Sequence, residues 1–292
     1  MSETVGIIGL GRAGSAAARA FIKEGFNVVG FDIDVNAVNA FVNDGGVAAV
    51  SPADVARNAK AVLVLVLSDE QVSEVLTGKD GVLEGSQDGS VVICMSTIQR
   101  TTLRRMAEAS GKANAGFLDC PFTGGPARIS TKSLTLIVAG SEELVTKVSH
   151  ILVVIGKIVY AGSEPGLAQA VKHCNQLLAG VTHAATMEVI ALARRLGLDP
   201  ALVVSVAGSG IAGSDYFRLL SDSVLNKNPS PGGLGQMCKD MKIVTATIQE
   251  SGFSARVASA ASQYFQEAQD RGMEGREGAD LINVVDIVNV HS

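Results

Sequence analysis

The sequence predicts an α/β protein: a doubly wound parallel sheet followed by an all-α domain, joined by a long helix. Up to about residue 160, short apolar runs alternate with amphipathic stretches. This alternation is typical of parallel strands covered by helices on both faces. From residue 165 onward, the sequence has only helix and loop character. We therefore expect one domain at residues 1–164 and a second, helical domain at residues 165–292.

The strands of the first domain are predicted from apolar runs of four to seven residues. Helix-like sequence follows each of the first four strands, for example at residues 14–24 and 69–76. Runs of this length between helical segments are typical of buried parallel strands. The expected strands cover residues 5–8, 28–31, 61–67, 91–95, 116–119, 134–139 and 155–160.

A long helix is predicted over residues 165–196. Gly166 and Gly180 are its only glycines, and Pro165 suits a first turn. Ser163 is expected to cap it. The apolar positions that recur at helical spacing are Leu167, Val171, Cys174, Leu178 and Val181.

Composition and charge exclude several classes of protein. The chain is 47% hydrophobic and 18% charged, which indicates a folded rather than a disordered protein. The net charge is −5 and no segment gathers Lys and Arg, so neither nucleic acid nor a membrane is an expected partner. The start of the chain lacks a signal-peptide pattern, and a cytoplasmic location is expected. The four cysteines and four histidines do not cluster at metal-ligand spacing, so we expect reduced thiols and no metal.

Residues 9–14 (GLGRAG) have the spacing of a dinucleotide-binding loop. They follow a predicted strand and open a helix, and Asp32 lies 18 residues beyond Gly14 at the end of the next strand. Gly9 would allow the tight turn, Gly11 would let the backbone approach a pyrophosphate, and Gly14 would let helix and strand pack closely. An ordinary glycine-containing turn is the alternative. The expected cofactor-binding residues here are Gly9, Leu10, Gly11, Arg12, Ala13 and Gly14.

Asp32 favours NAD over NADP. A carboxylate at this strand end accepts hydrogen bonds from ribose hydroxyls but repels a 2′-phosphate. Residues 25–56 contain no Lys or Arg, and Asp34 adds a second negative charge. Taken alone, Asp34 is better explained as the N-cap of the following helix.

Four further segments carry a family resemblance. They are residues 94–98 (CMSTI), residues 119–125 (DCPFTGG), the helix from Gly166 with Lys172 and Asn175, and Lys239-Asp240. With these motifs in this order, nearly the whole chain resembles the β-hydroxyacid dehydrogenase family, which includes 3-hydroxyisobutyrate, tartronate semialdehyde and L-threonate dehydrogenases. Residues 176–180 (QLLAG) are similar to the threonate-type members.

The resemblance implies an oxidoreductase with a Rossmann domain that transfers a hydride between NAD and a small 3-hydroxy or sugar acid. Lys172 would be the general acid/base. Free lysine titrates near pH ~10, and partial burial and a nearby positive nicotinamide would both lower that value. Most helical lysines instead extend into solvent, which is the alternative.

The resemblance assigns further residues to the site. Asn175 and Gln176 follow Lys172 on the same helix face, where an amide can orient the lysine or bind substrate. Gln176 stands where the family has a second asparagine, so the division of roles between the two amides is open. We also expect Thr123, Gly124 and Gly125 to bind a substrate carboxylate, although a plain glycine turn is the alternative.

Other expected contacts lie near the nicotinamide. Thr97 would contact the nicotinamide or the substrate, and Leu67 and Ser68 the cofactor. The resemblance suggests that Lys239 closes over the cofactor and that Asp240 holds the site together. A solvated charge pair of little consequence is the alternative for both.

Two other functions remain open at this stage: an imine or aldehyde-acid reductase on the same scaffold, and a non-catalytic NAD-binding regulator. Such relatives tend to lose the lysine that this chain keeps. Ser214-Asp215-Tyr216 replaces a usual Ser-Trp pair, so the identity and stereochemistry of the substrate are open. His173 is interpreted as a packing or surface residue. A homodimer or homotetramer is expected from the resemblance alone.

Overall fold

The computed structural model describes residues 3–286. The chain forms two compact units, Met1–Lys172 and His173–Ser292. The division falls inside helix α8 (Leu167–Arg195), whereas the sequence placed the domain boundary at residue 164. The first unit contains the sheet, and within the described residues the second contains helices and one isolated bridge between Gly233 and Glu277.

The sheet of the first unit has nine strands. Their order is β3-β2-β1-β4-β5-β6-β8-β7, with β9 beside β8. From β3 to β6 all pairings are parallel, as predicted, while β8 runs antiparallel to β6 and β7. The strands are β1 (Thr4–Ile8), β2 (Asn27–Phe31), β3 (Val47–Ala48), β4 (Ala61–Val64), β5 (Val91–Cys94), β6 (Gly116–Asp119), β7 (Phe122–Thr123), β8 (Leu134–Ala139) and β9 (Gly156–Gly162).

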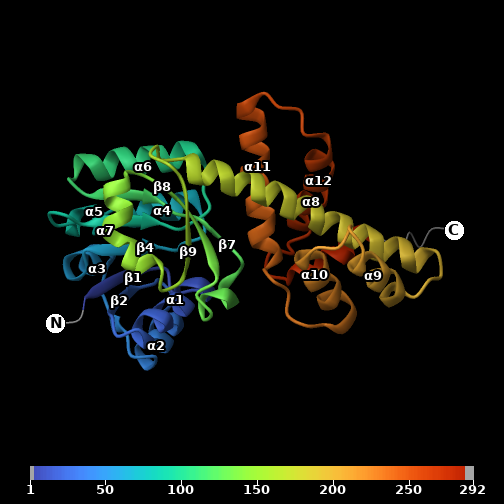
Figure 1. Cartoon of the computed structure of the whole chain (residues 1–292), viewed down its shortest axis with the longest axis horizontal. Coiled ribbons are helices and arrows are strands. Elements are labelled where there is room, and N and C mark those ends of the chain that lie inside the picture. Colours follow the sequence, from blue (N-terminus) through green and yellow to red (C-terminus); the bar gives the residue numbers. More distant parts are fainter. Residues whose placement is uncertain (1–2, 287–292) are drawn as a thin grey trace. The chain divides into compact units, whose positions relative to one another are not determined.

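Helices cover both faces of this sheet (Figure 1). Successive residues of β1 alternate between two apolar clusters: Ile7 packs with Phe21 of the first helix, while Ile8 belongs to the cluster on the other face. The helices of the unit before α8 are α1 (Arg12–Lys23), α2 (Val35–Asn43), α3 (Pro52–Asn58), α4 (Asp69–Thr77), α5 (Val82–Gly85), α6 (Arg100–Lys112) and α7 (Glu142–Leu152), with the 3₁₀ turn η1 (Pro126–Ile129).

The strand register places several loops at one edge of the sheet. Ile8 pairs with Phe31 on one side and with Val64 on the other. Gly9, Asp32 and Leu65 therefore all begin loops at the carboxyl ends of neighbouring strands. In open parallel sheets this edge is where ligands bind.

The second unit is a helical bundle built around the later part of α8. Met187, Ile190 and Phe265 are among its buried core residues. At Gly180 of α8 a Cβ atom would lie 2.1 Å from the Met241 sulfur, so any side chain there would require Met241 to move. The other elements are α9 (Pro200–Ser209), α10 (Asp215–Asn226), α11 (Leu234–Ser251), α12 (Arg256–Asp270), η2 (Gly278–Leu281) and α13 (Ile282–Val285).

Helix α8 is long and apolar enough to cross a membrane by length and composition alone. Half of its most apolar window is buried inside the protein, which is typical of the core helix of a folded domain.

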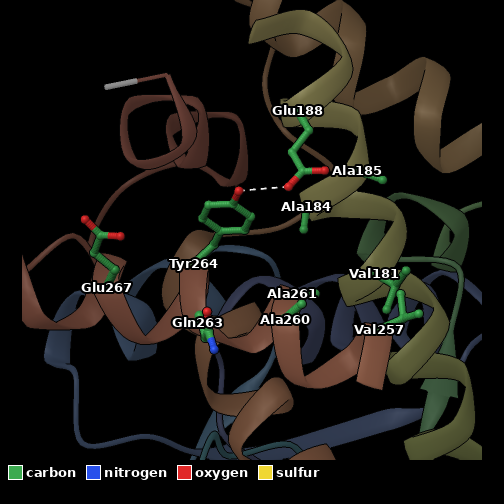
Figure 2. A pocket seen from close by; sticks show the side chains of 10 residues that line it. All are labelled: Val181, Ala184, Ala185, Glu188, Val257, Ala260, Ala261, Gln263, Tyr264 and Glu267. Carbon is green, nitrogen blue, oxygen red and sulfur yellow. Dashed lines mark hydrogen bonds between the residues drawn. The ribbon is translucent and has the colours of Figure 1, made fainter. Parts of the chain in front are cut away.

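A hollow of about 300 Å³ opens on the second unit between α8 and α12. At its rim the Tyr264 hydroxyl donates a hydrogen bond to Glu188 at 2.8 Å, as Figure 2 shows, and this bond raises the pKa of Tyr264. None of the site residues predicted from sequence lines this hollow.

Candidate active site

The glycine loop after β1 has the backbone geometry of a tight strand-to-helix turn. Gly9 has a φ of +92°, and its N–H donates to the Phe31 carbonyl at 2.9 Å. A Cβ atom on Gly14 would lie 1.8 Å from the Gly9 oxygen, so only glycine permits this approach of helix and loop. Gly11, the N-cap of α1, is exposed, and a Cβ there would meet no atom within 4 Å. The loop is therefore tight at two glycines and open at the third.

The Asp32 carboxylate is held beside this loop. Its Oδ2 accepts a hydrogen bond from the Leu10 N–H at 2.6 Å, and its Oδ1 accepts one from the Asp34 N–H at 2.9 Å. Asp34 itself caps α2 by accepting from the Asn36 N–H, as expected. The Asp32 oxygens keep lone pairs for further donors. These features of the loop and of Asp32 fit the phosphates and ribose of a dinucleotide.

The residues after β4 and β5 are also placed by local hydrogen bonds. Ser68 caps α4 through a capping box with Gln71, whose side chain accepts from the Leu67 N–H at 2.8 Å. Leu67 is exposed and Thr97 half-buried. The Ser68 hydroxyl therefore already has a structural role in this loop.

Asp119, at the end of β6, caps helix α8. Its Oδ2 accepts from the N–H groups of Gly166 at 2.8 Å and Gln169 at 3.1 Å. The predicted cap at Ser163 is wrong, because the helix begins three residues later than that cap requires and a distant carboxylate takes the role. Burial raises the pKa of Asp119 to about 6, although the backbone hydrogen bonds oppose the rise.

Gln169 was missed by the sequence analysis. Its side chain is buried, and Nε2 donates to the Ser96 carbonyl at 2.9 Å and to Asp119 Oδ1 at 3.2 Å. Its Oε1 accepts from the Ile98 N–H at 3.2 Å. One amide thus joins the loop after β5, the end of β6 and the first turn of α8. A polar residue in the apolar stretch 167–171 (LAQAV) was the only available signal.

Lys172 lies one turn after Gln169 on α8 and is 7% exposed. It therefore does not extend into solvent as most helical lysines do. It belongs to the same compact unit as the glycine loop, Asp32 and Asp119.

The segment Thr123-Gly124-Gly125 forms the end of β7 and a turn. Thr123 pairs with Thr135 of β8 and is half-buried. The two glycines have φ values of +116° and +75°, which explains glycine at both positions.

In the second unit, Gln176, Asp240 and Lys239 form one connected group. Gln176 Nε2 donates to Asp240 Oδ2 at 2.6 Å, and Lys239 Nζ lies 2.9 Å from Asp240 Oδ1. Asn175 Nδ2 donates to Gln176 Oε1 at 2.9 Å. Asp240 is 1% exposed, so the alternative of a solvated charge pair does not describe it. The Gln176 amide is oriented by the carboxylate on one side and by Asn175 on the other.

The histidines of this unit are packed groups. The His183 ring lies 2.9 Å from the Gly278 carbonyl and 3.2 Å from the Tyr216 hydroxyl. Burial lowers the pKa of His183 to about 4 and raises that of Tyr216. His173 is 2% exposed and bonds Thr247 at 2.9 Å, which is a packing position. Among residues 3–286 no three His, Cys, Asp or Glu side chains gather as a metal site would require, and all four cysteines are free.

Comparison with known proteins adds to this geometry. The family model of the NAD-binding domain of 6-phosphogluconate dehydrogenase matches residues 4–162, over half of the chain. A second model, the NAD-binding domain of NADP-dependent 3-hydroxyisobutyrate dehydrogenase, matches residues 166–285. The chain belongs to the β-hydroxyacid dehydrogenase family.

Individual relatives agree with this assignment. The L-threonate dehydrogenase of Cupriavidus necator is 31% identical, and the alignment covers 97% of this chain and 96% of that protein. The mitochondrial 3-hydroxyisobutyrate dehydrogenase of Bos taurus is 30% identical, and the alignment covers 90% of this chain and 80% of that protein. A solved 3-hydroxyisobutyrate dehydrogenase from Salmonella typhimurium superposes with a TM-score of 0.89 at 29% identity, covering 97% of this chain and 100% of that one.

As a family member, the protein is an NAD(P)-dependent oxidoreductase that acts on a CH–OH group. The relatives named above are dehydrogenases of L-threonate and 3-hydroxyisobutyrate, which are small hydroxy acids. Imine reductases share the fold at 18–21% identity, which bears on the fold alone.

Proposed function

We propose that this dehydrogenase oxidises the hydroxyl of a small 3-hydroxy or sugar acid with NAD, and that Lys172 is its general acid/base. The observation that carries the proposal is the burial of Lys172 one turn beyond an anchored helix start, in the unit that contains the glycine loop. A buried amine on a fixed helix meets the positional demand of proton transfer.

NAD supplies the hydride acceptor when bound. The loop 9–14 would hold its pyrophosphate on the first N–H groups of α1, and Asp32 its ribose hydroxyls. Leu67, Ser68, Thr97 and Lys239 would complete the cofactor contacts. NAD is favoured over NADP because residues 25–56 contain no Lys or Arg to offset the charge of Asp32 against a 2′-phosphate.

In oxidation, neutral Lys172 Nζ accepts the proton of the substrate hydroxyl. In reduction, the ammonium returns that proton to the forming alkoxide. Asn175 and Gln176 share the helix face of Lys172 and would orient the hydroxyl, with Asp240 and Asn175 fixing the Gln176 amide. Thr123, Gly124 and Gly125 would bind the carboxylate of the acid. We further propose a homodimer or homotetramer in the cytoplasm.

The decisive experiment follows NAD reduction by absorbance against a panel of small hydroxy acids that includes L-threonate and 3-hydroxyisobutyrate. We expect one of them to be oxidised, and Lys172→Ala to lower kcat by about 100- to 10,000-fold, because the proton acceptor is lost. Lys157→Ala, at an exposed strand position, is the matched control. Activity of Lys172→Ala within about threefold of wild type would refute the role of Lys172.

The cofactor assignment has its own test. Calorimetric titration should give tighter binding of NAD than of NADP, and Asp32→Ala should narrow that difference because the repulsion is removed. Tighter binding of NADP by the wild-type protein would contradict the reading of Asp32. Turnover of a cyclic imine, with no hydroxy acid oxidised, would favour the reductase alternative.

A further inference from the structure

We propose that Gln169 is a positioning residue that sets the place of the Lys172 amine. The inference rests on the proposed function of Lys172 and adds the means by which that amine is held. It begins from the bonding of a single buried amide within the first compact unit.

The Gln169 amide is fully used. Its two N–H groups donate to the Ser96 carbonyl and to Asp119 Oδ1, and its oxygen accepts from the Ile98 N–H. A buried amide with all its groups paired has a single orientation, since any rotation would leave polar atoms unpaired in the interior. Gln169 is therefore fixed against two neighbouring strand ends, those of β5 and β6.

The backbone of the same residue is fixed by the same carboxylate. Asp119 Oδ2 accepts from the N–H groups of Gly166, directly before α8, and of Gln169, in its first turn. The Arg100 side chain donates to the Gly166 carbonyl at 3.2 Å. The start of α8 is thus tied to the sheet through its backbone and through one side chain, and neither rotation nor sliding of this turn is possible without breaking several of these bonds.

Lys172 follows three residues after Gln169, about 4.5 Å further along the helix axis and on the same side of the helix. A single helical turn transmits a shift of its anchor to the next turn. A misplacement of about 1 Å at a reacting group can cost as much as 100-fold in rate. The structure therefore assigns to Gln169 an influence on proton transfer, without contact with the reacting atoms.

The test compares Gln169→Met with Gln87→Met. Methionine keeps the length of glutamine but makes none of its amide hydrogen bonds. Gln87 is an exposed residue of the same unit whose Nε2 also donates to a backbone carbonyl, that of Arg57, at 2.9 Å. We expect Gln169→Met to lower kcat by about 10- to 100-fold while the Kd for NAD stays within about twofold, and Gln87→Met to change neither.

Asp119→Asn provides a second variant if Gln169→Met folds poorly. Asparagine has one acceptor oxygen where aspartate has two. If that oxygen accepts from the helix N–H groups, the NH₂ group faces Gln169 Nε2 and the bond between the two side chains is lost. If the two residues act through one connection, the double variant should lose little more kcat than the stronger single variant. Fully additive losses, or a kcat of Gln169→Met within about threefold of wild type, would overturn the inference.

Two measurements separate this inference from the proposed function, because neither needs turnover. Amide hydrogen exchange over residues 164–175 should be faster in Gln169→Met by about tenfold than in Gln87→Met. The rate of Lys172 acetylation by acetic anhydride, read by peptide mass spectrometry, should change while that of Lys157 does not. If both stay unchanged, Gln169 does not position Lys172, whatever the substrate panel shows. If both change and no hydroxy acid is oxidised, the proposed function fails and the positioning role stands.

Discussion

Within residues 3–286, each of the two units buries one carboxylate, and the two carboxylates are compensated differently. Asp119 in the first unit and Asp240 in the second are 0% and 1% exposed. Asp119 faces two backbone N–H groups and the Gln169 amide. Asp240 faces the Lys239 ammonium and the Gln176 amide. One carboxylate is stabilised by dipoles, and the other by a cation.

This difference teaches what each carboxylate is suited to do. Dipoles at a helix N-terminus favour a negative charge, but by less than burial disfavours it at Asp119, whose pKa rises to about 6. Asp119 is therefore an anchor whose charge changes near neutral pH. Asp240 has a cation within 3 Å and accepts a hydrogen bond from the Gln176 amide, which suits it to hold that amide in place.

The largest effect on stability is expected from removing the Lys239 cation beside Asp240. Lys239→Met leaves Asp240 buried with only an amide donor, and breaking a buried ion pair in this way costs about 3 kcal/mol. The loss arises because the Asp240 carboxylate keeps its buried position but no longer faces the Lys239 ammonium. Urea unfolding at pH 8 measures the loss.

Lys242→Met, at an exposed position on the same helix, is the control for that experiment. It should change the free energy of unfolding by less than about 0.5 kcal/mol. Equal losses from both lysine variants would mean that the Lys239–Asp240 pair contributes no more than a surface charge.

A slightly smaller effect is expected from Asp119→Asn. The folded pKa of Asp119 lies above its ordinary value of 3.8, so its contribution to stability is fully present below pH 3.8 and is lost as the pH rises through about 6. Asparagine does not titrate. The stability of the variant relative to wild type should therefore rise by about 2 kcal/mol between pH 4 and pH 7, and stay level above that.

Urea unfolding of both proteins across this pH range checks the sign as well as the size. The hydrogen bonds that asparagine changes add a difference in the free energy of unfolding that does not depend on pH. The test is therefore how the difference between variant and wild type changes with pH. A difference that is flat from pH 4 to pH 7 would show that Asp119 has an ordinary pKa and is no different from an exposed carboxylate.

The sequence predicted most of the first unit because its signals are local. Buried parallel strands read as apolar runs, and six of the seven expected strands match within two residues at each end. The run 61–67 was too long, since Leu65 to Leu67 leave the sheet for the loop that leads to Ser68. Strands β3 and β7 were missed because two residues each are too few to form a pattern.

The anchor of α8 could not be predicted in the same way. Asp119 lies 47 residues before Gly166 in the sequence, and no local spacing indicates that the two meet. Gln169 resembled any polar residue on a helix, because its partners at Ser96 and Ile98 come from another strand end. The motifs around Asp119 and Lys172 were recognisable, but the connection between them is a tertiary feature.

The smallest expected effect concerns the cap that the sequence favoured. Ser163 is exposed and precedes α8 by four residues, so Ser163→Ala should change the free energy of unfolding by less than about 0.5 kcal/mol, against about 1 kcal/mol for a true cap. Ser68→Ala, which removes the capping box of α4, is the matched positive control. If Ser163→Ala costs as much as Ser68→Ala, then the serine contributes to the start of α8 and Asp119 is not its sole cap. If Ser163→Ala leaves the free energy of unfolding unchanged and the effect of Asp119→Asn depends on pH, then the N-terminus of α8 is capped by Asp119, a buried carboxylate at the end of a strand.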